Sequence, residues 1–242
     1  MVIFKFKNFI LAVSLLAGLA LFSSCDRVEI SAEIDADDVA EFVEASLQAR
    51  TAGLEALVDS LVAKVEDFSI EGICDSQYQD QWTYTRQGAL INGSYQSDWT
   101  FLLSCTALDL PEMANFTSDA SAEYGTQRIS SEDSVSFDGT VDGLKISEGK
   151  FSLNADYLRE GTQELRTGVE IYDVVSTLEM DVIGLQIQKT DYTITTGTAT
   201  FTFEGEIEGE SFTFNGAIVF NGNSTATVTI NNNSYTVDLD RF

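Results

Sequence analysis

Carboxylates are by far the most numerous side chains in this 242-residue sequence that can do chemistry: 39 Asp and Glu residues face 13 Lys and Arg residues and no histidine. Without histidine, Ser-His-Asp and Cys-His nucleophiles are excluded, and so are most zinc and iron sites. Paired carboxylates can hydrolyse glycosidic bonds, but so many acids come together by chance on any fold. We therefore expect no enzyme, no metal and no cofactor, and a hydrolase ranks third among the functional hypotheses.

The thiol chemistry rests on three cysteines, Cys25, Cys74 and Cys105. Cys74 and Cys105 form an even pair, and in an exported protein the simplest interpretation is a disulfide. Such a bridge stabilises a fold by roughly 3–4 kcal/mol in the chain-entropy model. A catalytic or metal-binding pair is the weaker alternative, because neither residue has a neighbouring cysteine.

Cys25 follows a segment with the composition of an export signal. Two lysines stand in the first seven positions, an apolar run covers residues 9–22, and the run ends in Leu21-Phe22-Ser23-Ser24-Cys25. A positive start, a short apolar stretch and small residues before a cut site indicate a secretory signal. The pentapeptide resembles the bacterial lipobox, although Phe22 is larger than the residue that motif prefers. The resemblance implies that residues 1–24 are a signal peptide and that Cys25 carries lipid; the alternative is an ordinary signal peptide that happens to contain a cysteine.

The residues after Cys25 suggest where such a lipoprotein would reside. Residues 25–35 are rich in Asp and Glu, which resembles the surface-export signals of Bacteroidota lipoproteins. Asp26 alone resembles the inner-membrane retention signal of enteric bacteria. We favour the outer membrane, with the periplasmic or surface face left open. The membrane is thus one expected partner, reached through the acyl chains of Cys25, which contribute about 0.8 kcal/mol per buried CH₂.

The net charge of the chain limits which classes of molecule can be its other partners. Removing residues 1–24, which hold two lysines and no acids, leaves 218 residues with 11 basic and 39 acidic side chains, a net charge of −28. So negative a chain repels nucleic acids. We expect residues 25–35 to be an acidic tether and residues 36–242 to be a single domain.

The first element of that domain is an amphipathic helix. Between residues 36 and 68, apolar side chains recur at steps of three and four, and acids suited to capping precede them. We call this row of apolar side chains the apolar seam. The spacing is interrupted at Arg50 and Thr51, and Gly53 follows, so a kinked helix or two shorter helices are alternatives to one continuous helix.

Beyond residue 79 the period changes to two, which predicts strands. Residues 191–240 form an antiparallel meander if turns lie at residues 197–198, 208–209, 221–223 and 232–233, because each turn then keeps apolar residues on one face. Residues 106–132, which include the only proline, are expected to form a long loop or an internal boundary. Trp82 and Trp99 are interpreted as core residues rather than as a carbohydrate platform.

The expected fold is mainly β: an N-terminal amphipathic helix packed against a curved antiparallel β-meander or half-barrel. The leading hypothesis is a non-enzymatic envelope lipoprotein that binds an apolar small molecule or lipid, and the alternative is a structural or interaction protein that contacts an envelope protein through its Thr/Asn/Glu face. One face of the meander carries the large apolar residues, which either bind the ligand or fill the core: Tyr192, Phe201, Phe203, Phe212, Phe214, Ile218, Val228 and Tyr235.

Overall fold

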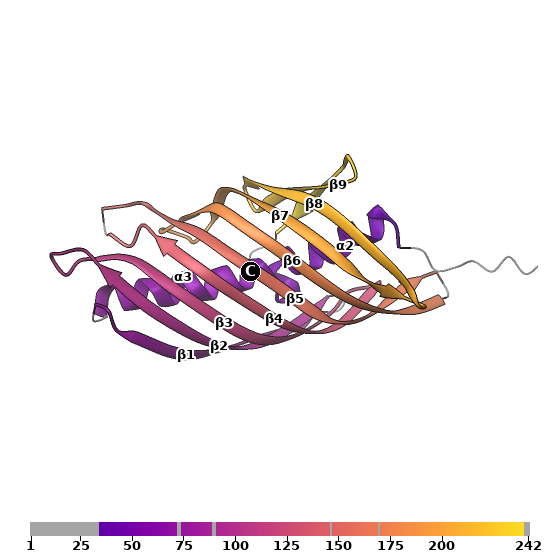
Figure 1. Cartoon of the computed structure of the whole chain (residues 1–242), viewed down its shortest axis with the longest axis horizontal. Helices are drawn as coiled ribbons and strands as arrows, with labels where there is room; N and C mark the ends of the chain where they lie inside the picture. The colour runs from indigo at the N-terminus through magenta and orange to yellow at the C-terminus, as the bar shows by residue number, and fades with distance from the viewer. Residues whose placement is uncertain (1–33, 72–73, 89–90, 146, 169, 240–242) are drawn as a thin grey trace, which may run out of the picture. The chain divides into compact units, whose positions relative to one another are not determined.

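The computed structural model describes residues 34–71, 74–88, 91–145, 147–168 and 170–239. Within these ranges the chain forms two α-helices, a short 3-10 helix and ten β-strands, labelled in Figure 1. The predicted lipidation site Cys25 and the signal peptide lie outside the described residues, as does most of the acidic tether.

The N-terminal apolar seam forms two helices. Helix α2 (Ala36–Leu47) begins at Asp35, whose carboxylate accepts hydrogen bonds from the backbone N–H groups of Asp37 and Asp38 at 2.9 and 3.0 Å. The Asp38 carboxylate in turn accepts from the backbone N–H of Asp35 at 3.4 Å, which completes a capping box. The acids at the start of the seam therefore act as the caps that their spacing predicted.

The break between the helices falls where the seam lapses. A 3-10 helix, η1 (Ala49–Thr51), follows α2, Ala52 adopts a left-handed conformation with φ of 57°, and helix α3 (Leu54–Glu71) begins after Gly53. A Cβ on Gly53 would lie 2.5 Å from the carbonyl oxygen of Ser46, so only glycine fits this close approach. Of the alternatives that the sequence left open, the structure has two helices.

The rest of the chain is one ten-stranded antiparallel sheet. Each strand pairs only with its neighbours in the sequence, and within the described residues β1 and β10 do not pair, so the sheet is open. The predicted antiparallel meander is therefore confirmed and extends over almost the whole domain. Its strands are β1 (Gln77–Arg86), β2 (Asn92–Cys105), β3 (Pro111–Gly125), β4 (Ile129–Asp142), β5 (Lys150–Thr167), β6 (Glu170–Gln188), β7 (Ile194–Ile207), β8 (Glu210–Gly222), β9 (Thr225–Ile230) and β10 (Asn233–Asp238).

Burial alternates along the strands, as expected for a sheet with one dry and one wet face. We call the buried side the inner face and the solvent side the outer face. The inner-face side chains form one hydrophobic cluster that also contains the apolar residues of α2 and α3.

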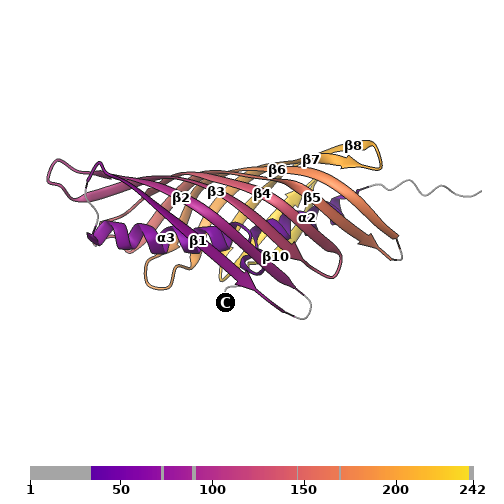
Figure 2. The same ribbon diagram turned by 90° about the horizontal axis from the view of Figure 1, so that it is seen from below.

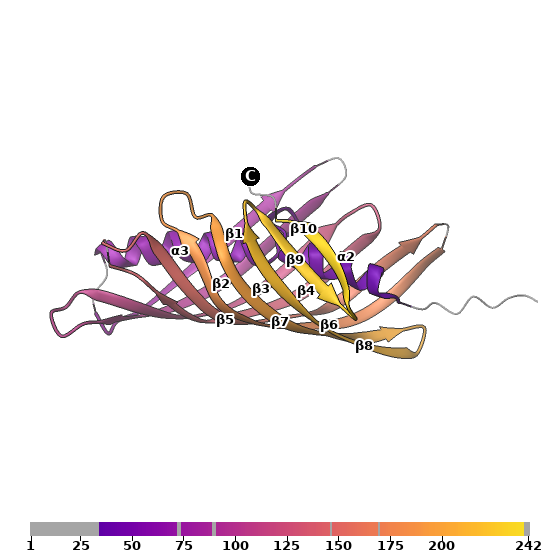
Figure 3. The same ribbon diagram turned by 90° about the horizontal axis from the view of Figure 1, so that it is seen from above.

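Individual contacts join the helices to strands at both edges of the sheet. Phe68 of α3 stacks on Tyr78 of β1 with ring centres 4.7 Å apart; both elements are labelled in Figure 2. Asp37 of α2 accepts a hydrogen bond from the hydroxyl of Tyr235 in β10 at 2.8 Å; Figure 3 labels these two elements. Phe42 of α2 stacks on Phe203 of β7 at 5.3 Å.

Three of the four predicted turns need correction. The turn at residues 208–209 is right, and it pairs Phe203 with Phe214. The last two turns lie at residues 223–224 and 231–232, where all four residues have positive φ. The register of β8 against β9 and that of β9 against β10 each differ from the prediction by two residues. A shift of two leaves every side chain on its predicted face.

The remaining turn prediction, at residues 197–198, is wrong because Gly197 lies inside β7. Its φ is +151°, a backbone conformation that L side chains rarely adopt, and a Cβ there would lie 2.8 Å from Leu185. The pairing of β6 with β7 is irregular at this point. Gly197 thus permits a close approach at a bulge rather than a reversal of the chain.

The long loop predicted over residues 106–132 is also wrong, because β3 occupies most of it. Pro111 is the first residue of that strand, a position where its missing N–H is tolerated. The inner-face positions of β3 include Ser118, Ala120 and Ala122, which are too small to give a clear apolar alternation.

The sulfur atoms of Cys74 and Cys105 lie 2.00 Å apart, at disulfide distance, with their Cα atoms 5.6 Å apart. The pair ties the chain just before β1 to the last residue of β2. This location matches the structural disulfide that the sequence predicts.

Candidate binding site

The eight apolar residues proposed from the sequence all belong to the interior of the domain. Phe201, Phe203, Ile218 and Val228 are buried, whereas Tyr192, Phe212, Phe214 and Tyr235 are partly buried and pack against the same core. They are not one group, because Tyr192 and Tyr235 bind helix residues through their hydroxyls.

The phenylalanines among them are in close contact with one another and with the backbone. The ring centres of Phe203 and Phe212 lie 5.4 Å apart, and those of Phe212 and Phe214 lie 6.3 Å apart. The ring of Phe201 lies over Gly216 of the next strand, where a Cβ would overlap it. These contacts are those of a packed core and leave the phenylalanines little space for a ligand.

A different part of the inner face holds a buried ion pair. The Nε of Arg159 in β5 donates to Oδ2 of Asp133 in β4 at 2.6 Å, and the side chains are 4% and 0% exposed. Arg159 lies two positions after the inner-face residue Tyr157 in β5, so it is on the inner face as well. Asp133 lies two positions before the inner-face residue Val135 in β4 and is on the same face. Burying a guanidinium and a carboxylate is costly unless their hydrogen-bonding groups are satisfied.

Both oxygens of the Asp133 carboxylate accept hydrogen bonds. Oδ1 of Asp133 accepts from Ser131 at 2.7 Å and from the amide of Gln163 at 2.8 Å. The Gln163 carbonyl oxygen accepts in turn from Ser176 at 2.8 Å. Asp133 also lies against Gly161, where a Cβ would overlap its carboxylate. Polar groups on β4, β5 and β6 therefore fix this side chain.

The Arg159 guanidinium donates to Asp133 through its Nε edge only. Its carbon lies 4.6 Å from the centre of the Tyr124 ring, a cation–π contact from β3. Nη1 and Nη2 of Arg159 and the hydroxyl of Tyr157 have no partner in full hydrogen-bonding geometry among the described residues, although the Tyr157 oxygen and the guanidinium interact with each other. Buried donors in native proteins are almost always paired with protein, water or ligand. We call Arg159, Asp133, Tyr124, Tyr157 and Gln163 the arginine cluster.

Electrostatics keep Tyr157 and Arg159 protonated. Burial raises the pKa of the Tyr157 phenol against the opposing effect of the Arg159 charge, so the hydroxyl keeps its proton. Burial alone would lower the pKa of Arg159, but its interactions with Tyr157, Asp133 and Tyr124 raise it overall. The cluster therefore presents N–H and O–H donors at any physiological pH.

A hollow opens where α2 and η1 meet the hairpin turns. It has a volume of about 280 Å³ and is lined by Glu41, Glu44, Ala45, Gln48, Arg50, Ile91, Thr126, Gln127, Arg128 and Ile129. Its wall residue Ile129 is buried, and Ser131 of the arginine cluster's hydrogen-bond network follows two positions later on the same face of β4.

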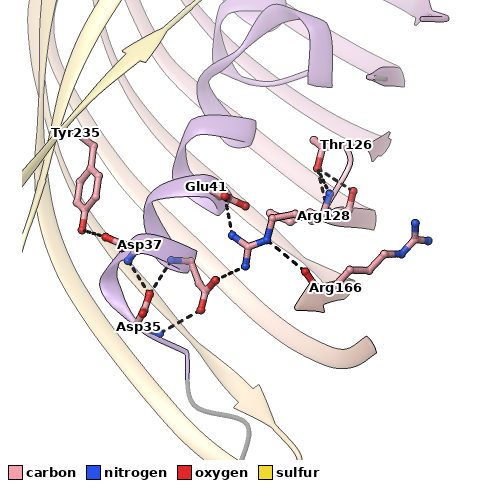
Figure 4. A network of polar contacts seen from close by, with 9 residues as sticks. Asp35, Asp37, Glu41, Thr126, Arg128, Arg166 and Tyr235 are labelled. Carbon is pink, nitrogen blue, oxygen red and sulfur yellow. Dashed lines mark hydrogen bonds and ion pairs between the residues drawn. The ribbon is translucent and has the colours of Figure 1, made fainter. Parts of the chain in front are cut away.

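An ion-pair network shares Glu41 and Arg128 with the lining of this hollow, and Figure 4 shows the network. Arg128 donates to Glu41 at 2.7 Å and to Asp38 at 2.6 Å, and its Nε donates to the carbonyl oxygen of Arg166 at 3.3 Å. The network joins the start of α2 to the β3–β4 turn and to the end of β5. It thereby fixes one wall of the hollow against the other.

The outer face offers carboxylates instead of donors. Asp138, Asp156 and Asp181 stand directly opposite one another on β4, β5 and β6. Beside them lies an open hollow of about 550 Å³ lined in part by Leu158, Glu179, Thr202 and Asn215. Among the residues that the structure describes, no group of three or more His, Cys, Asp or Glu side chains has a metal-binding arrangement.

Compared with models of protein families, with curated proteins and with solved structures, the chain gives no match. None of the helices in the described region combines the length and the apolar character needed to cross a membrane.

The sequence analysis did not find the arginine cluster, although a signal for it exists. Phe151, Leu153, Ala155 and Tyr157 establish an inward phase of period two, and continuing that phase places Arg159 and Gln163 on the dry face. A charged residue in phase with buried apolar residues is the informative exception in such a pattern.

Proposed function

We propose that this protein is a lipid-anchored, non-enzymatic lipoprotein of the cell envelope that binds an amphiphilic ligand inside its domain. The signal-like residues 1–24 and the lipobox-like sequence at Cys25 support the anchor. The outer membrane is the membrane we propose, on the strength of the acidic residues 25–35. The strongly acidic composition supports the absence of nucleic acid among its partners.

In this proposal the curved sheet wraps around the helices as a half-barrel. The stacking of Phe42 on Phe203 and of Phe68 on Tyr78 supports it, as does the common hydrophobic cluster. The helical seam residues Val39, Val43 and Leu61 are fully buried. Since the helices fill so much of the inner face, the ligand cannot occupy all of it and is confined to the region of the arginine cluster.

The observation that carries the proposal is the unpaired edge of Arg159. Two guanidinium nitrogens and a tyrosine hydroxyl are buried without partners in full hydrogen-bonding geometry among the described residues. An interior that were only structural would gain stability from pairing these donors or from replacing the ion pair with apolar side chains. Donors fixed and left free in this way suit a ligand that supplies acceptors.

The test uses the mature domain with Cys25 replaced by serine, exported and purified without detergent. Native mass spectrometry should show a stoichiometric adduct of lipid-like mass that is lost on denaturation and recovered by organic extraction. A clean apo mass that stays unchanged after incubation with envelope lipids would refute ligand binding. Radiolabelled palmitate should enter the full-length protein but not its Cys25→Ser variant, and equal labelling of both would refute the anchor.

A second candidate function is interaction with an envelope protein through the outer face. The in-register carboxylates Asp138, Asp156 and Asp181 favour it, because like charges directly opposite one another destabilise a sheet and are a cost without a partner. Cross-linking in cells through a photoreactive residue at Thr202 should capture a protein if this function is real. The same residue placed at exposed Ser234, outside the hollow, is the matched control.

A further inference from the structure

The arginine cluster also limits the chemistry of the ligand, and this step rests on the proposed function. Every unpaired group in the cluster can donate: Nη1 and Nη2 of Arg159 and the hydroxyl of Tyr157. The acceptor in the cluster, the Asp133 carboxylate, already receives three hydrogen bonds. The two guanidinium nitrogens can only donate, whereas the Tyr157 hydroxyl can also accept. A ligand that pairs with the free edge of Arg159 must therefore bring an oxygen acceptor.

The charge balance decides which kind of acceptor fits. Asp133 and Arg159 form a one-to-one ion pair with almost no exposure to solvent. A ligand carboxylate or phosphate would add an uncompensated negative charge to this buried site, which is strongly unfavourable. An uncharged carbonyl accepts the same hydrogen bonds and leaves the pair neutral.

The cluster is also pre-arranged for such an acceptor. The Nε–Asp133 bond and the Tyr124 ring fix the plane of the guanidinium, so its free edge points in one direction before a ligand arrives. Little conformational freedom is then lost on binding. The residues paired beside Arg159 on the inner face are the apolar Val135 and Leu178. Apolar neighbours of this kind suit an acyl chain.

We propose that the ligand is an acylated molecule whose uncharged ester or amide carbonyl binds the free edge of Arg159 and the Tyr157 hydroxyl. Free fatty acids and other anionic head groups are disfavoured by the Asp133 carboxylate. A hydrogen bond to a charged donor is worth roughly 10- to 100-fold in affinity.

The experiment compares three probes that share one chain: methyl oleate, oleate and the alkene 9-octadecene, which lacks an oxygen. Binding to the soluble domain is measured by native mass spectrometry at pH 8, where oleate is ionised. Methyl oleate should bind at least tenfold more tightly than either of the other two. A preference for oleate would overturn the proposal and indicate an anion site, whereas no binding of any probe would overturn the proposed function itself.

Two variants test whether the preference for methyl oleate arises at the arginine cluster. Asp133→Asn removes the compensating charge, so the preference should reverse toward oleate. The double variant Arg159→Met, Asp133→Leu removes both charges and should bind methyl oleate and 9-octadecene equally. Arg166→Met, which removes an exposed arginine from the same strand, is the control and should behave like the unaltered protein. If methyl oleate bound all four proteins equally, ligand binding would stand but the role of Arg159 would be refuted.

A spectroscopic readout does not depend on variants that may fold poorly. Methyl oleate labelled with ¹³C at its carbonyl should absorb in the infrared at a lower frequency when bound than in an alkane solvent, because the carbonyl is hydrogen-bonded. A bound carbonyl with the alkane frequency would overturn the assignment.

Discussion

Removing the carboxylate of the buried ion pair should be one of the most destabilising single changes in this domain. Asp133→Ala leaves the Arg159 charge uncompensated in the interior, and it also removes the acceptor of Ser131 and Gln163. Breaking a buried pair in this way costs about 3–5 kcal/mol of unfolding free energy. At about 2–4 °C per kcal/mol for a domain of this size, the melting temperature should fall by about 6–20 °C.

Urea denaturation followed by circular dichroism measures this loss, and two comparisons show its origin. The double variant Asp133→Leu, Arg159→Met removes both charges together and should lose at least about 2 kcal/mol less than the single variant. Added salt should not change the difference between Asp133→Ala and the unaltered protein, because buried pairs are poorly screened. A loss below about 1 kcal/mol for Asp133→Ala, or a loss that shrinks with salt, would refute the assignment of a buried pair.

Three further predictions address other parts of the fold. Gly216→Ala should destabilise the domain by about 1–3 kcal/mol through overpacking against the neighbouring strands, whereas Gly149→Ala, with open space around its Cβ position, should change little in the same urea titration. Asp35→Ala should cost about 0.5–2 kcal/mol by removing the α2 cap, and an unchanged melting temperature would contradict that role. The hydrogen bond to Glu66, helped by burial, raises the pKa of Tyr192 to about 12 from 10.0, so its stabilisation is complete below pH 10 and is lost as the pH rises through 12. Melting curves between pH 9 and 12 should therefore show a smaller decline for Tyr192→Phe than for the unaltered protein, and parallel declines would contradict the shift.

The faces of the strands were easier to predict than their turns. Side chains alternate with a fixed period of two, so a strand with several large apolar residues has its inner face defined wherever its turn lies. Turn positions depend on which residues adopt positive φ, and asparagine offered several choices: the β9–β10 turn uses Asn231 and Asn232 rather than Asn233. The turn at Gly209 was unambiguous because glycine stands at the required position.

The arginine cluster could not be inferred in full for a different reason. The period of two places Arg159 inside, but nothing in the sequence shows that Asp133, 26 positions away, is its partner. That pairing depends on the register of β4 against β5, which the period of two does not define. The small residues Ser118, Ala120 and Ala122 interrupt the apolar alternation of β3 between Phe116 and Tyr124, because Ser and Ala bury too little apolar surface to continue the pattern.

The strictly sequential order of the sheet has a consequence for how the protein assembles. Because every strand finds its partner in the segment just before it, the sheet can grow one hairpin at a time from its N-terminal end, and Cys74 and Cys105 are both present once the first hairpin has emerged. Contacts between the two ends come last, such as the hydrogen bond from the Gln48 side chain to the carbonyl oxygen of Asp238, which spans 190 positions. Contacts within a hairpin are more local than contacts between the two ends of the sheet and form earlier, so most of the sheet can form before its C-terminal strands join it.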